Sequence, residues 1–487
     1  MPQEGFHGPL ERVDECCWRI PRSYKPGMRV DGLIFASEQL IDAIRNDHSP
    51  EQVANVAYLP GIQYASLAMP DIHWGYGFCI GGVCATDPDQ GGVISPGGVG
   101  YDINCGVRLI RTNLSLGELK PHLKAIVDEL FRQVPAGVGR GGQYRFNRKE
   151  LRRLMATGPR FLMDRGLVTE SDLEHTEAGG CLDAAEPDCV SERALERGAD
   201  QCGTLGSGNH FLEVQVVDAV FDEAAARTMS LEKDMVCVMI HSGSRGLGYQ
   251  VCDDALKQLR RAPEKYGIEL PDRQLVCAPI NSHEGRHYLG AMAAAANYAW
   301  ANRQLLMAQA RDAFATVLGR TWQQLQMNLI YDVAHNIAKP EWHEVDGQQR
   351  RLWVHRKGAT RAFPAGHPEI PSLYQKIGQP VLIPGDMGRA SWVLAGMPGS
   401  MERSFGTACH GAGRMLSRTA AAKQAQGRRI DQELAQRGVI ARARSWRGLA
   451  EEQPDAYKDV DLVVDVVHQA NLARKVARLR PIGVVKG

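Results

Sequence analysis

Two residues that could bind a metal ion lie three positions apart in the glycine-rich stretch GGVGYDINCGVR, residues 97–108. Asp102 offers a carboxylate and Cys105 a thiolate. The surrounding glycines leave few side chains to pack and allow the backbone to turn sharply. An acid and a thiol presented on such a loop are more typical of metal ligands than of a hydrophobic core.

Four histidines lie beside small or polar residues: His210 in GTLGSGNHFLEV, His241 in IHSGSRGLGYQV, His335 in VAHNIAK and His410 in CHGAGR. The apolar run MVCVMI ends directly at His241, and LIYDV ends just before His335. Both runs are typical of strands, and loops held by strands are where sites usually form. We therefore expect these histidines to lie near a site.

The combined donor set indicates which metals could bind. One carboxylate, one thiolate and three imidazoles suit borderline divalent ions such as Mn²⁺ or Zn²⁺. Five ligands exceed the needs of one tetrahedral ion, whereas two ions sharing the thiolate would use them all, and two-metal sites commonly serve phosphoryl transfer. Only Asp102 and Cys105 are close in sequence, so unrelated polar residues in separate turns are the alternative. The proposed ligands are Asp102, Cys105, His210, His241 and His335.

His410 is followed by Gly411 and Gly413 and then by a run of helical character. We expect its ring to lie beside a helix N-terminus, where free N–H groups favour phosphate. Arg414 and Arg418, four residues apart, would share one face of that helix. The arrangement fits a phosphate-bearing intermediate, and histidine is a recognised nucleophile. The alternative is that the two arginines pair with acids on a solvated face.

Composition restricts the class of protein. The 487 residues carry a net charge of +1, which excludes a polybasic nucleic-acid coat, so an RNA partner needs a local patch. The 12 cysteines form no CxxC pair, as expected of reduced cytosolic thiols. The polar N-terminal stretch lacks the apolar core of a signal peptide. The apolar stretch from Tyr288 is interrupted by Asn297, Asn302 and Arg303 and predicts a buried helix, not a membrane span.

Strands and helices alternate along most of the chain, and residues from about 115 to 200 have a charged, helical pattern. There is no fixed-period repeat and no low-complexity linker. We expect an α+β fold: one large domain over residues 1–487, with mixed or antiparallel sheets, surrounding helices and a helical insertion at about 115–200.

Ordered motifs spanning nearly the whole chain resemble the RtcB family of GTP-dependent RNA-splicing ligases. They are MPDIHWGYGFCIGG, SPGGVGYDINCGVR, LGSGNHFLE, IHSGSRGLG, VAHNIAK, RKGATRA, PGDMGRASWVL, HGAGR and PIGVVKG. The resemblance implies an enzyme that joins RNA ending in a 2′,3′-cyclic phosphate or 3′-phosphate to RNA with a 5′-hydroxyl, in tRNA splicing or RNA repair, using GTP and two Mn²⁺ ions.

The resemblance also implies roles for individual residues. His410 would become guanylylated by GTP and pass the GMP to the RNA 3′-phosphate, and Cys105 would bridge the two metals. The nucleotide pocket would comprise Asn209, Glu213, Ser391, His410, Gly411, Gly413, Tyr457 and Lys486. The positions matching substrate-phosphate contacts or neighbours of the site are Asp71, Arg245, Arg414 and Arg418.

Two residues depart from the family pattern: Cys79 stands where proline is expected, and Asp386 stands where a small hydroxyl residue is common. An acid at position 386 would change contacts to the guanine or the phosphates, so this departure affects the expected nucleotide preference. The cysteine usage and the lack of a clear membrane span predict a cytoplasmic protein without a membrane partner. The resemblance favours a monomer, and the need for an activating partner such as archease is left open. Two other classes were weighed against the ligase, namely a two-metal phosphoesterase without a covalent nucleotide step and a noncatalytic RNA-binding scaffold. The setting of His410 and the terminal Lys486 argue against the first, and the full ligand set argues against the second.

Overall fold

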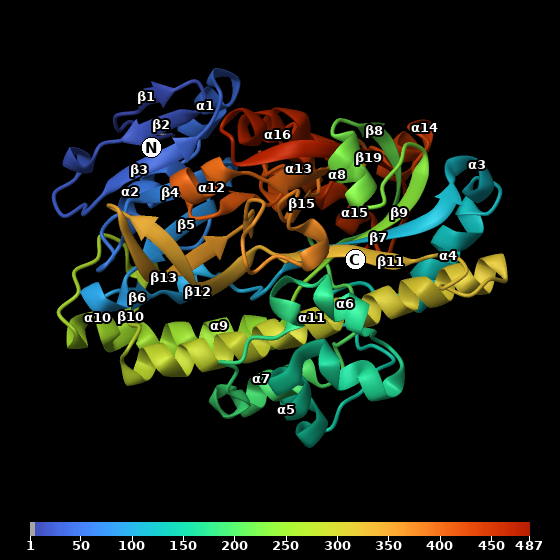
Figure 1. The fold of residues 1–487 in the computed structure, drawn as a ribbon, viewed down its shortest axis with the longest axis horizontal. Coiled ribbons are helices and arrows are strands. Elements are labelled where there is room, and N and C mark those ends of the chain that lie inside the picture. Colours follow the sequence, from blue (N-terminus) through green and yellow to red (C-terminus); the bar gives the residue numbers. More distant parts are fainter. Residues whose placement is uncertain (1–4) are drawn as a thin grey trace.

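The computed structural model describes residues 5–487. Helices surround two large sheets, and the long helix α11 (His283–Leu318) crosses the lower half of the view in Figure 1, with α5 (Arg148–Thr157) and α7 (Glu192–Gly198) drawn below it. The α+β class expected from the sequence is confirmed. Both large sheets are mixed, because each combines antiparallel neighbours with one parallel pair.

The first sheet has seven strands in the order β1-β2-β3-β4-β5-β13-β12, and only β3 and β4 are parallel. Its strands are β1 (Glu11–Asp14), β2 (Cys17–Ile20), β3 (Asp31–Phe35), β4 (Ala65–His73), β5 (Ile80–Thr86), β12 (Asn336–Val345) and β13 (Gln348–Lys357). Helices α1 (Glu38–Arg45) and α2 (Ser49–Val56) connect β3 to β4. A connection of this length is what a parallel pair requires.

The second sheet has eight strands in the order β11-β7-β9-β8-β19-β16-β15, and β18 pairs with β19 in parallel. Its strands are β7 (Gly106–Ser115), β8 (Phe211–Val220), β9 (Met235–Ser242), β11 (Asn328–Ala334), β15 (Pro380–Ile383), β16 (Ser391–Gly396), β18 (Ile440–Ala443) and β19 (Ala473–Lys486). The C-terminal PIGVVK segment is therefore part of an interior strand, which explains its apolar character.

Two small ladders and the remaining helices complete the fold. The ladders are β6 (Val93–Ile94) with β10 (Ala278–Pro279), and β14 (Ala359–Arg361) with β17 (Thr407–Cys409). The helices are α8 (Glu223–Thr228), α9 (Arg245–Gln258), α10 (Ala262–Lys265), α12 (Pro398–Ser404), α13 (Arg418–Gln424), α14 (Ile430–Gln436), α15 (Trp446–Glu451) and α16 (Val460–Gln469).

The segment expected to be helical contains α3 (Leu116–Leu119), α4 (Leu123–Gln133), α5 (Arg148–Thr157), α6 (Glu170–Glu174) and α7 (Glu192–Gly198). These helices do not form a separate core. Apolar residues of α5 pack in one cluster with α11, and those of α4 pack against strands of the second sheet.

Helix α11 is buried along most of its length, as its alanine-rich sequence predicts. The Ser282 hydroxyl caps its start by accepting from the Gly285 N–H at 3.0 Å, and Gly319 ends it with a left-handed φ of 63°. Within residues 5–487, no helix combines the length and the apolar character that crossing a membrane requires. Polar residues inside α11 form hydrogen bonds with other parts of the protein, including the loops of the candidate site.

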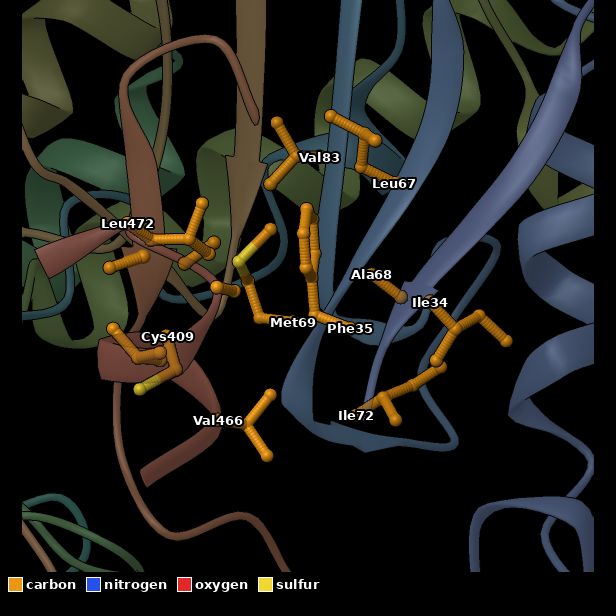
Figure 2. Packing of buried hydrophobic residues seen from close by; sticks show 14 of the residues in the cluster. Ile34, Phe35, Leu67, Ala68, Met69, Ile72, Val83, Cys409, Val466 and Leu472 are labelled. Carbon is orange, nitrogen blue, oxygen red and sulfur yellow. The ribbon is translucent and has the colours of Figure 1, made fainter. Parts of the chain in front are cut away.

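A hydrophobic layer joins the first sheet to the C-terminal part of the chain. Figure 2 shows Met69 and Ile72 of β4 in the same cluster as Cys409 of β17 and Val466 of α16, and all four are buried. Met69 and Ile72 flank Asp71 in sequence, and Cys409 immediately precedes His410. Packing of this layer therefore fixes the two segments that bring Asp71 and His410 together.

Candidate functional site

The residues predicted to bind metal lie at one end of the second sheet. β7 begins directly after Cys105, and β8 begins directly after His210. His241, near the end of β9, is paired with Phe211 of β8, and His335 lies between β11 and β12. Because β11, β7, β9 and β8 are successive neighbours in the sheet, their ends place these side chains together.

The five donors form two groups that share the thiol. Cys105 Sγ lies 3.3 Å from His210 Nε2 and 3.2 Å from His241 Nε2. His241 Nε2 lies 3.2 Å from His335 Nε2, and His210 Nε2 lies 2.8 Å from Asp102 Oδ2. Within each group, Cys105–His241–His335 and Asp102–Cys105–His210, the donor atoms lie within 4.8 Å of one another. Two cations bridged by one thiolate fit this arrangement.

The local electrostatics suit a cation. Burial lowers the pKa of His241 and His335, so both rings are neutral and offer a lone pair. Burial, together with the nearby Asp102 carboxylate, raises the pKa of the Cys105 thiol. Although burial alone raises the pKa of Asp102, His210 beside it lowers that pKa to about 2. Metal binding would then displace the thiol proton and supply the positive charge that this buried cluster lacks.

Arg303, inside α11, holds two of the loops that carry these ligands. It donates to the backbone oxygens of Asn104 and Ser242 at 2.7 and 3.0 Å, each next to a predicted ligand in sequence. Its other nitrogens bind both carboxylate oxygens of Asp332 at 2.7 and 2.8 Å. The arginine and the aspartate are fully buried, so the pair fixes the loops relative to the helix.

The neighbouring Asn302 ties in a third loop. Its Oδ1 accepts from the backbone N–H groups of Gly203 and Thr204 at 2.7 and 3.1 Å, and its Nδ2 donates to the Gly243 carbonyl at 3.0 Å. Two adjacent helical residues therefore connect the loops around Cys105, His210 and His241.

We expect Arg303→Met to weaken divalent metal binding by about 10- to 100-fold, because it releases the carbonyls that position the ligand loops. Titration with Co²⁺, followed by thiolate-to-cobalt absorbance, measures this. Arg311→Met is the matched control: Arg311 is another buried arginine of α11, and it binds Asp172 at 2.9 Å. Equal loss of cobalt affinity in both variants would contradict the role given to Arg303.

A second feature is the pairing of His410 with Asp71. His410 Nδ1 lies 2.5 Å from Asp71 Oδ2, which also accepts from the backbone N–H groups of His410 and Gly411 at 3.1 and 3.2 Å. Asp71 is fully buried. The contact places the imidazole proton on Nδ1 and leaves Nε2 free. The ring centroid lies 4.8 Å from that of His335, so the free nitrogen adjoins the candidate metal centre.

Lys458 supports Asp71 from behind. Its ammonium group donates to the carbonyls of Pro70 and Ile72, on either side of Asp71, at 3.2 and 2.6 Å. Burial lowers the pKa of Lys458 to about 8. Because Lys458 directly follows Tyr457 in sequence, one short segment contributes to two parts of the site.

The expected helix after His410 is wrong in its position. Helix α13 begins only at Arg418, so the His410 ring does not lie beside a helix N-terminus. Gly413 has a φ of 75°, and a Cβ there would lie 2.2 Å from the Asp71 carbonyl oxygen, so the chain passes too close to β4 to coil. Arg414 instead forms a β-bridge with Tyr457 and shares no helix face with Arg418.

The two arginines nevertheless converge on a buried acid, Glu452. Its Oε1 lies 3.0 Å from Arg414 Nη1 and 3.4 Å from Arg418 Nε. Its Oε2 accepts from the Tyr457 hydroxyl and lies 3.8 Å from Lys486 Nζ. Three cations around one carboxylate leave a net positive charge, which favours an anionic ligand.

Glu213 is a second buried acid of the pocket, and its charge interacts with that of Lys486. It accepts from Gln215 Nε2 at 2.8 Å, and the same amide group donates to the Ser391 hydroxyl at 3.0 Å. Burial raises the pKa of Glu213 to about 7 and that of Asp386 to about 6. Ser391 therefore acts through Gln215 on the orientation of Glu213.

The raised pKa of Glu213 predicts a pH dependence of stability. The folded protein holds this proton more tightly than the unfolded chain, so the contribution favours folding at low pH and is lost as the pH rises through about 7. We expect Glu213→Gln to gain on the order of 3 kcal/mol relative to wild type between pH 5 and pH 8. Thermal unfolding at several pH values measures this difference, and parallel pH profiles would contradict it.

One cavity collects most of the predicted residues. It is lined by Asp102, Cys105, Asn209, Glu213, His241, His335, His410, Gly411, Gly413, Arg414, Arg418, Tyr457 and Lys486. Three other predicted residues do not line the cavity and instead contact neighbouring side chains of the site. His210 contacts Cys105, Asp71 contacts His410, and Ser391 contacts Gln215. Arg245 lies outside this lining and donates to Thr204 Oγ1 at 3.2 Å. Asp386 lines the cavity, whereas Cys79 is buried in the hydrophobic core.

Several residues of the site were missed in the sequence. Glu452 lies in a stretch of charged residues typical of a solvated face, so only its burial identifies it. Asn302 and Arg303 were noted, but only as interruptions of an apolar stretch. Polar residues in a helix that is otherwise buried need partners, and that signal could have placed them against a site.

The motif resemblance is matched by comparison with known proteins. The sequence model of the family described as "tRNA-splicing ligase RtcB" matches residues 52–487. The chain is 55% identical to a tRNA-splicing ligase RtcB of Thermococcus kodakarensis over 479 residues, 98% of this chain and 99% of that protein. It is 55% identical to an RNA-splicing ligase RtcB of Mycobacterium tuberculosis over 438 residues, 90% of this chain and 100% of that protein. The chain therefore belongs to the RtcB family.

Proposed function

We propose that this protein is a GTP-dependent RNA ligase that joins 2′,3′-cyclic phosphate or 3′-phosphate ends to 5′-hydroxyl ends, in tRNA splicing or RNA repair. The observation that carries the proposal is the pairing of His410 with Asp71 beside two metal-ligand groups that share Cys105. The same cavity is lined by the proposed nucleophile, by the residues proposed to bind phosphate and by most of the proposed metal ligands.

Two Mn²⁺ ions would be held by the two ligand groups, both of which include Cys105. The preference for manganese comes from the family resemblance, because these ligand types suit several divalent ions. When bound, the ions supply electrophilic stabilisation of phosphoryl oxygens.

His410 would form the covalent intermediate. With Nδ1 bound to Asp71, its Nε2 attacks the α-phosphorus of GTP, a nitrogen–phosphorus bond forms, and pyrophosphate leaves. The Asp71 carboxylate stabilises the positive charge that develops on the imidazole. The cations around Glu452 would bind phosphate oxygens, while the buried Glu213 would accept hydrogen bonds from the guanine base.

The proposed RNA steps are those that the family resemblance implies. Water first hydrolyses the P–O2′ bond of a cyclic phosphate, which gives the 3′-phosphate and a free 2′-hydroxyl. An oxygen of the RNA 3′-phosphate then attacks the guanylylated His410 and takes the GMP, which gives an RNA-ppG end. The 5′-hydroxyl of the second RNA attacks that end, expels GMP and forms the phosphodiester. Action as a cytoplasmic monomer and activation by archease stay predictions.

Incubation of the protein with α-phosphate-labelled GTP and Mn²⁺, followed by a denaturing gel, tests the proposal. A protein-bound label that is labile in acid and stable in alkali is expected, since that stability is characteristic of a phosphoramidate. Absence of the label in protein with metal confirmed bound, together with hydrolysis of RNA phosphate ends, would instead indicate a two-metal phosphoesterase.

A further inference from the structure

A glycine-rich loop beside the cavity, residues 137–142, has no role in the proposed reaction. Its base is joined to the loop that carries Asn209 and His210: Ala136 forms a β-bridge with Gly206, and the Gly137 N–H donates to the Gly206 carbonyl at 2.8 Å. Gly487, next to the cavity residue Lys486, lies against both loops. The 137–142 loop therefore lies at the rim of the cavity.

Two arginines from distant parts of the sequence meet on this loop. A Cβ placed on Gly137 would lie 3.6 Å from Arg140 Cγ and 3.8 Å from Arg444 Cγ, so both side chains approach the same point. Both residues are exposed. Neither forms an ion pair with a carboxylate in residues 5–487; Asp200, which lies against Gly141, also pairs with neither. The Arg444 guanidinium lies over the Phe131 ring, with Cζ 5.0 Å from the ring centroid. Arginines without a carboxylate partner are available to bind an anion.

Two further arginines contact the neighbouring loop that carries Asn209 and His210. Arg245 lies against Gly206, where a Cβ would come within 2.2 Å of its Nη1, and Arg418 lies against Gly208, where a Cβ would come within 2.6 Å of its Nη2. Both were predicted from the family to lie at the substrate phosphate. Since the Gly137 N–H donates to the Gly206 carbonyl, the loop that Arg140 and Arg444 approach is bonded to the loop that Arg245 and Arg418 contact.

We propose that Arg140 and Arg444 form an outer subsite for the phosphodiester backbone of an RNA strand whose terminus reacts in the cavity. The proposal rests on the proposed function and extends it to the path of the substrate. Guanidinium groups match phosphate oxygens in geometry, and backbone contacts position a strand without reading its sequence. The subsite should therefore bind RNA of any sequence, provided that the strand is long enough to reach it.

Fluorescence polarisation with metal-loaded protein tests this subsite. The probes are single-stranded RNAs of about 20 nucleotides, one with a 3′-phosphate and one with a 5′-hydroxyl as the reactive end, and matching RNAs of about four nucleotides. The test variant is Arg140→Ala/Arg444→Ala, and Arg140→Lys/Arg444→Lys retains the charge. The control is Arg351→Ala, since Arg351 is an exposed arginine of β13 that forms no ion pair within residues 5–487 and lies outside the cavity lining.

We expect the alanine double variant to bind one or both long RNAs about tenfold more weakly, and the slope of log Kd against log salt to fall by about 1.4, as two lost phosphate contacts require. The lysine variant should retain the slope, and binding of short RNA and labelling by GTP should not change. The long RNA that loses affinity identifies the strand that uses the subsite.

An unchanged slope for both long RNAs, or an equal loss with Arg351→Ala, would overturn the proposal. Failure of wild type to label with GTP would refute the proposed function without affecting this comparison.

Discussion

Replacing Cys105 with alanine is expected to remove metal from both halves of the candidate centre. The thiol lies between the two ligand groups, 3.3 Å from His210 Nε2 and 3.2 Å from His241 Nε2. Without it, each group retains two donors, which is too few to hold a divalent ion tightly at a protein site. Every proposed step should fail together, and elemental analysis of the purified variant should find metal lost from both positions.

The matched control is Cys237→Ala. Cys237 is a fully buried thiol on β9, the strand that also carries His241, but it belongs to neither ligand group. That variant should lose some stability from the small cavity and retain its metal. If Cys105→Ala instead retained one ion per chain at wild-type affinity, the thiolate would belong to one group alone and the shared arrangement would be wrong.

Most of the candidate metal ligands could be proposed from the sequence because they carry a local signal. Asp102 and Cys105 lie among glycines, and His241 and His335 lie where apolar strands end. Their assembly could not be derived from spacing, since it depends on the order β11-β7-β9-β8 in one sheet. The family resemblance supplied that grouping in advance, and the structure supplies its physical basis.

The supporting residues were harder to predict because their role depends on burial. Arg414 and Arg418 were expected on one helix face. The close approach of Gly413 to Asp71 prevents a helix there, and both arginines reach Glu452 by separate routes. Nothing in the local pattern distinguishes Glu452 from a solvated acid. Long-range packing, not local propensity, decides which of these charges forms the pocket.

His410→Ala should reduce labelling by GTP about 10³-fold or more. Among the histidines that line the cavity, only His410 has a ring nitrogen bound to a buried carboxylate. His410 Nδ1 is bound to the fully buried Asp71, which leaves Nε2 as the nucleophile. His73 lines the same cavity, but its ring contacts the Asp71 backbone oxygen at 3.1 Å, not the carboxylate. His73→Ala is therefore the control, and it should retain the label.

The decisive measurement supplies His410→Ala with RNA that already carries the ppG end. In the proposed mechanism, sealing of that end needs attack by the 5′-hydroxyl and no transfer through His410, so the variant should join this RNA while failing with GTP and a 3′-phosphate. Full ligation from GTP would show that another group is the nucleophile. Failure to seal the activated RNA, with two ions still bound, would place the His410 ring in the last step as well. Because His410 lies 4.8 Å from His335 between ring centroids, metal content must be measured in the same preparation to separate these roles.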